Sequence, residues 1–315
     1  AGTLDLASRD LSLETAYRIR EDRIQIENAR AKLPGIAAQF SGFFYRTPKP
    51  VIEIRGNAGL DLAQILKTRV PENSRLNDLG LIGSLSGAFT FKGAWNEWTR
   101  SQISFNAKSG AVKFIKNFRL EDLSLGAQMD NGILDILHLS AGAYDGRVGL
   151  KGLFDFNVPG IPFDTNFYAS GLDLHRLAAE LPLENKKLAG NLMLQSSLRG
   201  RLLDPGSFTG HGALSVKNGY LWETSQFKAM GNLPLVKVEG LDLVVFREMS
   251  AAYQISGKKL WTDSLTMASD TVRLGLRGSV GFDQSLDMLM DIEYTNAVFL
   301  GAEDAGGIVP MMVNQ

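Results

Sequence analysis

The chain has 315 residues, of which 44% are hydrophobic, and this is enough apolar surface for one large or two ordinary globular domains. Its 33 basic and 34 acidic residues give a formal net charge of −1, which removes the electrostatic basis for binding nucleic acid. Cysteine is absent, so disulfides, thiolate nucleophiles and cysteine-ligated metals are excluded.

The sequence contains an internal repeat with a period of about 110 residues. Residues 59–93 and 171–200 both open with GLDL, continue into a short helix-like segment that ends at a proline, and then enter a glycine-bearing strand-like run. The repeat predicts a partial N-terminal unit over 1–50, a first unit over 51–161, a second unit over 162–300 and a C-terminal tail over 301–315.

Alternation of apolar and polar residues with period two covers most of the chain and predicts half-buried strands. It is clearest over 148–158 and 272–282, and residues 286–294 are predicted to form an antiparallel neighbour of the latter. Many of the 33 glycines fall inside predicted strands, where they mark bends or the close approach of another backbone. The pattern therefore predicts a strongly curved sheet.

Helical signals are few and short. Residues 60–68 and 172–181 carry apolar residues at helical spacing, and 222–235 is a third, weaker candidate. Asp61 and Asp173, the aspartates of the two GLDL motifs, are predicted to be N-caps that accept hydrogen bonds from the first-turn amides.

No constellation of catalytic or metal-binding residues is found. The histidines, His138, His175 and His211, lie far apart in sequence on different kinds of element, without metal-ligand spacing. Neighbouring carboxylates such as Glu121 and Asp122 point apart on a strand, and the glycine pairs do not lie at a strand-to-helix turn. We therefore expect no enzymatic activity, no metal and no cofactor.

The C-terminal repeat carries an ordered series of features: a strand ending in NGYLW, an amphipathic segment, then LWTDSLTMAS and LRGSVGFD. This order resembles the C-terminal region of AsmA-like proteins, and the first repeat looks like a more divergent unit of the same kind. Members of that family are envelope proteins of diderm bacteria, held in the inner membrane by an N-terminal helix and extending into the periplasm. They are similar to bridge-like lipid transfer proteins, whose strands form an elongated, curled antiparallel sheet with an apolar groove.

The resemblance implies a periplasmic location and a part in phospholipid movement and outer-membrane biogenesis. The anchoring helix and the closing strand of the family are not found, so we expect this chain to be a piece of a longer protein. Membrane contact is accordingly expected through parts outside it. The predicted fold is mainly β, an elongated, curled antiparallel β-sheet built from the repeats, with a few short helices.

A sheet with one apolar face must cover that face. The pattern alone favours a closed sandwich or barrel, whereas the resemblance favours an open groove occupied by phospholipid or another acyl lipid. The competing function is a structural repeat scaffold that binds an envelope assembly protein through an exposed sheet edge. For the groove, the predicted lipid-contacting residues are Leu85, Phe89, Phe91, Leu150, Phe154, Phe156, Leu192, Leu194, Leu274, Leu276, Val280, Phe282, Met288 and Met290.

Overall fold

The computed structural model describes residues 2–8, 11–69, 80–94, 97, 100–114, 118–180, 189–202, 204–222, 243–269, 272–283 and 285–294. Within these residues the chain forms seventeen strands and two short helices. The first strands are β1 (Gly2–Ala7), β2 (Ser12–Ile19), β3 (Arg23–Leu33), β4 (Ile36–Tyr45), β5 (Val51–Asp61), β6 (Ile82–Gly93), β7 (Gln102–Phe114), β8 (Phe118–Asp130) and β9 (Ile133–Ala143). The others are β10 (Gly146–Asp155), β11 (Pro162–Asp173), β12 (Ala189–Arg201), β13 (Asp204–Trp222), β14 (Leu243–Ser256), β15 (Lys259–Ala268), β16 (Val272–Gly281) and β17 (Leu286–Tyr294). The helices are α1 (Leu62–Arg69) and α2 (Leu174–Glu180).

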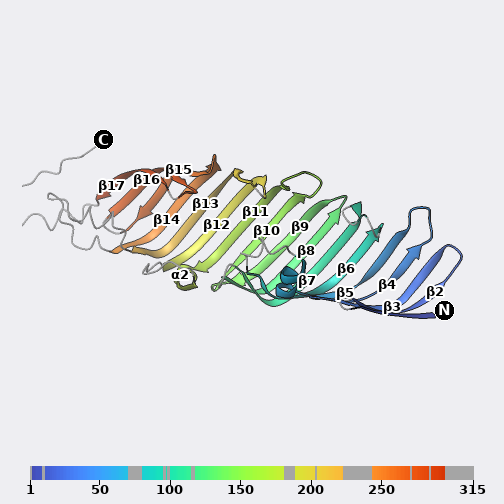
Figure 1. Ribbon diagram of the computed structural model, residues 1–315. Coiled ribbons are helices and arrows are strands. Elements are labelled where there is room, and N and C mark those ends of the chain that lie inside the picture. The colour runs from blue at the N-terminus through green and yellow to red at the C-terminus, as the bar shows by residue number, and fades with distance from the viewer. Residues whose placement is uncertain are drawn as a thin grey trace, which may run out of the picture.

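The strands form one antiparallel meander, in which each described strand pairs with the strand before it and the strand after it in sequence. Figure 1 shows the resulting elongated sheet, with the N-terminal strands at one end and the C-terminal strands at the other. Over the described residues the sheet does not close into a barrel. The predicted elongated antiparallel sheet is confirmed, and the closed arrangement favoured by the pattern alone is wrong.

Several neighbouring strands are joined by two-residue turns in which both central residues have positive φ. Asn131 (48°) and Gly132 (76°) join β8 to β9, Tyr144 (45°) and Asp145 (64°) join β9 to β10, and a Gly-Lys pair joins β14 to β15. Such turns match the right-handed twist of paired strands. Short connections of this kind keep successive strands adjacent and so produce a meander.

Two glycines on one face of the sheet allow neighbouring backbones to approach closely. A Cβ atom on Gly56 would lie 1.9 Å from the carbonyl oxygen of Gln39, and one on Gly87 would lie 1.9 Å from that of Asn106. Any side chain at these positions would push the adjacent strand away. These glycines therefore mark the close approach of neighbouring backbones, as the sequence pattern predicted.

Both helices begin where a strand ends. The Asp61 carboxylate accepts a hydrogen bond from the amide of Gln64 at 3.0 Å, and that of Asp173 accepts from the amides of His175 at 2.8 Å and Arg176 at 3.3 Å. The predicted N-caps are confirmed, and each helix starts two residues later than predicted because the capping motif completes the preceding strand. The third helix candidate lies outside the described residues, apart from Trp222, which ends β13.

The order of elements recurs along the sheet. The series β4, β5, α1 and β6 is followed six strands later by β10, β11, α2 and β12, and β16 again lies six strands after β10. The boundaries of the repeat units at 50, 161 and 300 stay predictions.

Candidate functional site

One row of residues can be followed through every described strand by the register of pairing. Directly paired residues lie on the same face of a sheet, so the row defines one face, called here the apolar face. From β1 to β17 the row consists of Leu4, Thr15, Ala29, Phe40, Gly56, Phe89, Phe105, Ala127, Ile136, Gly152, Thr165, Leu198, Gly210, Ile255, Leu260, Val280 and Leu286. The apolar face therefore runs the length of the described sheet.

The two polar residues in this row do not interrupt its apolar character. The Thr165 hydroxyl is buried and donates to the carbonyl of Leu198 at 3.1 Å, and the Thr15 hydroxyl donates to the carbonyl of Ala16 at 3.3 Å. A hydroxyl that is satisfied by the backbone needs no water. Both threonines therefore present their methyl-bearing side chains without an unpaired polar group.

Further apolar rows run beside the first on the same face. One, from β3 to β11, consists of Ile26, Gly42, Ile54, Phe91, Ile103, Met129, Leu134, Phe154 and Phe163. Another, from β4 to β14, consists of Ala38, Ala58, Gly87, Ala107, Leu125, Leu139, Leu150, Phe167, Ser196, Gly212 and Tyr253. The aromatic rings of Phe154 and Phe163 stack with their centroids 5.9 Å apart, which fills the space between β10 and β11.

Twelve of the fourteen predicted contact residues lie within strands and are brought together on this face. They are Leu85, Phe89, Phe91, Leu150, Phe154, Leu192, Leu194, Leu274, Leu276, Val280, Met288 and Met290. The predicted contact residues did not include Phe105, Phe163, Leu198, Ile255 and Leu260, although the same alternation marks each of them. Register, which the sequence does not show, is what unites them.

Phe156 and Phe282 were wrongly predicted to extend their strands. Each lies in a turn beyond the strand end, where 41% and 47% of its surface is exposed. The amide of Phe156 donates to the carbonyl of Gly132, and that of Phe282 donates to the carbonyl of Lys258, both at 2.9 Å. These bonds to neighbouring turns end the strands before the alternating sequence pattern ends.

The apolar face is covered by α2 along one margin, and its exposure varies elsewhere: Met129 and Phe163 are buried, whereas Val280 is open. Leu174 of α2 belongs to a buried cluster with Val216, Met267 and Leu274, and Leu274 is only 2% exposed. Val280, on the same strand as Leu274, is 38% exposed. Leu274 is therefore a core residue, whereas Val280 is available to a ligand.

Helix α2 is attached to the turn between β9 and β10. The Tyr144 hydroxyl donates to the Glu180 carboxylate at 2.8 Å, and Arg176 forms an ion pair with Asp145. Partial burial, together with this hydrogen bond and the negative charge of Glu180, raises the pKa of Tyr144 to about 12. These contacts hold α2 over the margin of the apolar face, along the border of the strands seen in Figure 1.

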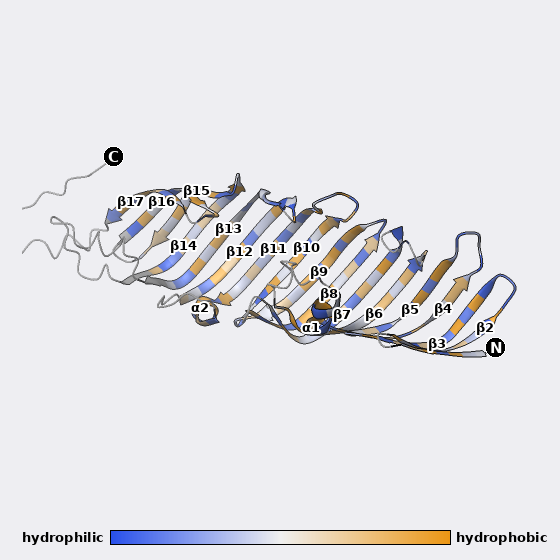
Figure 2. Ribbon diagram, in the orientation of Figure 1, coloured by the Kyte–Doolittle hydropathy of each residue, from blue (hydrophilic) through white to orange (hydrophobic). Residues whose placement is uncertain are grey.

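The opposite face, called here the polar face, carries cross-strand ion pairs. Arg273 pairs with Glu293 at 3.8 Å, and Lys92 pairs with Glu53 at 3.8 Å. Figure 2 shows hydrophobic and hydrophilic residues alternating along the strands. The sheet therefore separates an apolar surface from a hydrated one across the thickness of a single backbone layer.

The histidines fall on separate elements. His138 contacts Ser124 across β8 and β9, His175 lies on α2, and His211 lies in β13 opposite Ser197. In the described part of the chain, no group of three or more histidine, aspartate or glutamate side chains is arranged to hold a metal ion. None of the helices described has the length and apolarity needed to cross a bilayer.

No protein-family model, curated protein or solved structure matches this chain. The resemblance to AsmA-like proteins therefore rests on the order of the sequence motifs.

Proposed function

We propose that the chain is a non-catalytic lipid-binding or lipid-transfer segment that holds acyl chains on its apolar face. The observation that carries this proposal is the apolar row that continues through all seventeen described strands without an unpaired polar group. Each methylene that moves from water onto such a surface contributes roughly 0.8 kcal/mol. Affinity would then be spread over many positions, with no side chain indispensable.

The size of the sheet suits a row of lipids. With strands about 4.8 Å apart, the described sheet measures roughly 75 Å across its strands. Acyl chains can lie side by side on the apolar face while their headgroups stay in water. The resemblance to AsmA-like proteins supports phospholipid as the ligand and the periplasm as the location, with a part in outer-membrane biogenesis.

Native mass spectrometry of gently purified protein, followed by extraction and identification of bound lipid, tests the proposal directly. We expect one or more bound phospholipids. A compact, lipid-free monomer would contradict the proposal and favour the alternative scaffold, which binds a partner through a sheet edge.

A photo-crosslinking amino acid at two neighbouring positions gives a matched comparison. Phe154 lies on the apolar face, and Leu153, the next residue on β10, is 48% exposed on the polar face. We expect the probe at 154 to crosslink lipid and the probe at 153 not to. Equal labelling of the two positions would mean that lipid does not select the apolar face.

A single charge provides the loss-of-binding variant. In Val280→Glu the carboxylate would lie among the acyl chains, yet at a position 38% exposed it can still reach water, so we expect the fold to survive and lipid occupancy to fall. The control is Leu289→Glu, because Leu289 lies on the polar face of the neighbouring strand and is 47% exposed. Circular dichroism reports folding, and mass spectrometry reports occupancy. Unchanged occupancy in Val280→Glu would refute acyl-chain binding at this position.

A further inference from the structure

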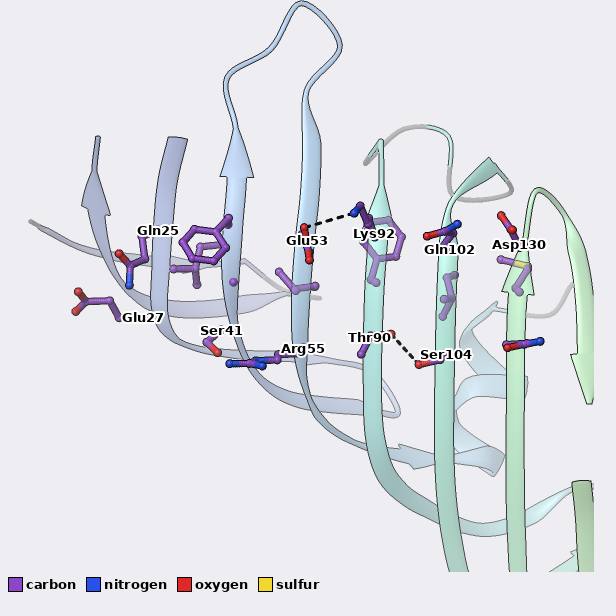
Figure 3. A pocket seen from close by; sticks show the side chains of 18 residues that line it. Gln25, Glu27, Ser41, Glu53, Arg55, Thr90, Lys92, Gln102, Ser104 and Asp130 are labelled. Carbon is purple, nitrogen blue, oxygen red and sulfur yellow. Dashed lines mark hydrogen bonds and ion pairs between the residues drawn. The ribbon is translucent and has the colours of Figure 1, made fainter. Parts of the chain in front are cut away.

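A hollow of about 940 Å³ lies across β3 to β8 and is bounded mainly by polar side chains. Figure 3 shows these side chains in two rows that cross the strands. One row consists of Gln25, Phe43, Glu53, Lys92, Gln102 and Asp130, and the other of Glu27, Ser41, Arg55, Thr90, Ser104 and Gln128. The hollow bounded by these twelve residues is called here the polar trough.

The register of pairing shows why the trough is continuous. Gln25, Phe43, Glu53, Lys92 and Gln102 pair in succession from β3 to β7, so their side chains stand in line. Between the two rows lies the apolar row that contains Ile54 and Phe91. Successive side chains of a strand point to opposite faces, so the side chains of this apolar row point away from the trough, toward the apolar face. The floor of the trough is therefore mostly backbone. Six strands about 4.8 Å apart give it a length of roughly 24 Å.

Part of the lining is bonded within the trough and part is free. Glu53 pairs with Lys92 at 3.8 Å, and Thr90 shares a hydrogen bond with Ser104 at 2.7 Å. The side chains of Gln25, Arg55 and Gln102 form no hydrogen bond or ion pair with any described residue. Two amides and a guanidinium, all with several N–H donors, are thus free to bind a ligand.

An aromatic ring stands in one wall. The Arg23 guanidinium lies 5.0 Å from the centroid of the Phe43 ring, and the Tyr45 ring is 6.1 Å from it on the same strand. These contacts hold the Phe43 ring in place beside the trough. An aromatic face of this kind can pack against an apolar C–H surface of a ligand.

The charges of the trough nearly balance, so they do not attract a polyanion. Three carboxylates, those of Glu27, Glu53 and Asp130, lie beside the cations Lys92 and Arg55, and Glu27 is also paired with Arg18 at 2.9 Å. The neutral remainder is made of amides, hydroxyls and one ring. A ligand that both donates and accepts hydrogen bonds and has no net charge suits such a lining best.

We propose that the polar trough binds a linear, uncharged polysaccharide, with about one sugar on each strand. The advance per sugar of an extended β-linked hexose chain is close to the inter-strand spacing of about 4.8 Å, so one sugar can lie over each strand, with successive sugars turning their hydroxyls toward alternate walls. Sugar hydroxyls donate to the carboxylates and accept from Arg55 and the free amides. The sheet's own ladder uses the backbone groups of β3 to β8, so a peptide cannot add here as a strand.

Isothermal titration of the 315-residue chain with cellohexaose and with chitohexaose tests the proposal. We expect saturable binding of at least one hexasaccharide and much weaker binding of the corresponding trisaccharide, which spans only half of the trough. Arg55→Ala removes a charged donor to the sugar and should weaken binding about tenfold. Gln254→Ala, on the polar face of β14 and outside the trough, is the control and should leave binding unchanged.

Three results would overturn the proposal: no binding of either hexasaccharide, equal affinity in Arg55→Ala and the parent chain, or saturable binding of an extended polar peptide of alternating Gln and Ser with no binding of sugar. Arg55 is exposed, so the variant should fold normally, and circular dichroism verifies this. The site lies on the face opposite the lipid-binding surface. Lipid occupancy in Arg55→Ala should accordingly match that of the parent chain, which separates the fate of this proposal from that of the lipid-binding function.

Discussion

The apolar face has a covered zone and an open zone, and a pair of substitutions on one strand can separate them. Leu274 and Val280 both lie on the apolar face of β16, but they are 2% and 38% exposed. If the covered zone is protein core and the open zone is a ligand surface, Leu274→Ala should destabilise the lipid-free fold much more than Val280→Ala does.

The magnitudes follow from burial. Leu274 packs in a cluster with Leu174, Val216, Phe246 and Met267, and truncating a fully buried leucine costs about 2–5 kcal/mol, so we expect about 3 kcal/mol. Val280→Ala removes two methyl groups that already touch solvent, and we expect a loss of about 0.5–1 kcal/mol.

Urea unfolding of delipidated protein, followed by circular dichroism, measures the difference. With a slope of about 3 kcal/mol/M, the midpoint should fall by about 1 M in Leu274→Ala and by about 0.3 M or less in Val280→Ala. Equal shifts in the two variants would refute the division into two zones, because they would show that Val280 is packed as tightly as Leu274.

Two further predictions concern the curvature of the sheet and the attachment of α2. Gly56→Ala would place a Cβ 1.9 Å from the Gln39 carbonyl oxygen and should destabilise the fold by about 1–3 kcal/mol. The control is Gly59→Ala on the same strand, whose Cβ would meet its nearest atom at 3.9 Å, and this variant should be tolerated. Equal melting temperatures of the two variants would contradict the close approach of β4 and β5. The raised pKa of Tyr144, about 12 against an ordinary value of 10, means that its neutral form stabilises the fold in full below pH 10 and that this contribution is lost as pH rises from 10 through about 12. Tyr144→Phe should therefore lose less stability than the parent between pH 10 and 12, and superimposable pH profiles would show that the hydroxyl does not couple to folding.

The sequence by itself determined the local features of this protein. Period-two alternation identified the strands and the side chains that share a face, because successive residues of a strand point to opposite sides whatever surrounds them. The aspartates of the GLDL motifs marked the helix starts, since a cap bonds only to amides two or three residues ahead. The alternation predicted a mainly β protein, and the resemblance to AsmA-like proteins implied that its antiparallel sheet is elongated and open.

The tertiary structure alone decided the features that depend on distant residues. Phe156 and Phe282 leave their strands because their amides bond to neighbouring turns, at Gly132 and Lys258, that are remote in sequence. Leu274 became core because α2 lies over it, while Val280 with the same alternation stayed open. Whether the sheet closes into a barrel depends on the summed twist and curl of its seventeen described strands. The polar trough exists only because the pairing register aligns polar residues of six strands. Pairing register and curvature are properties of many strands together, so no single stretch of sequence encodes them.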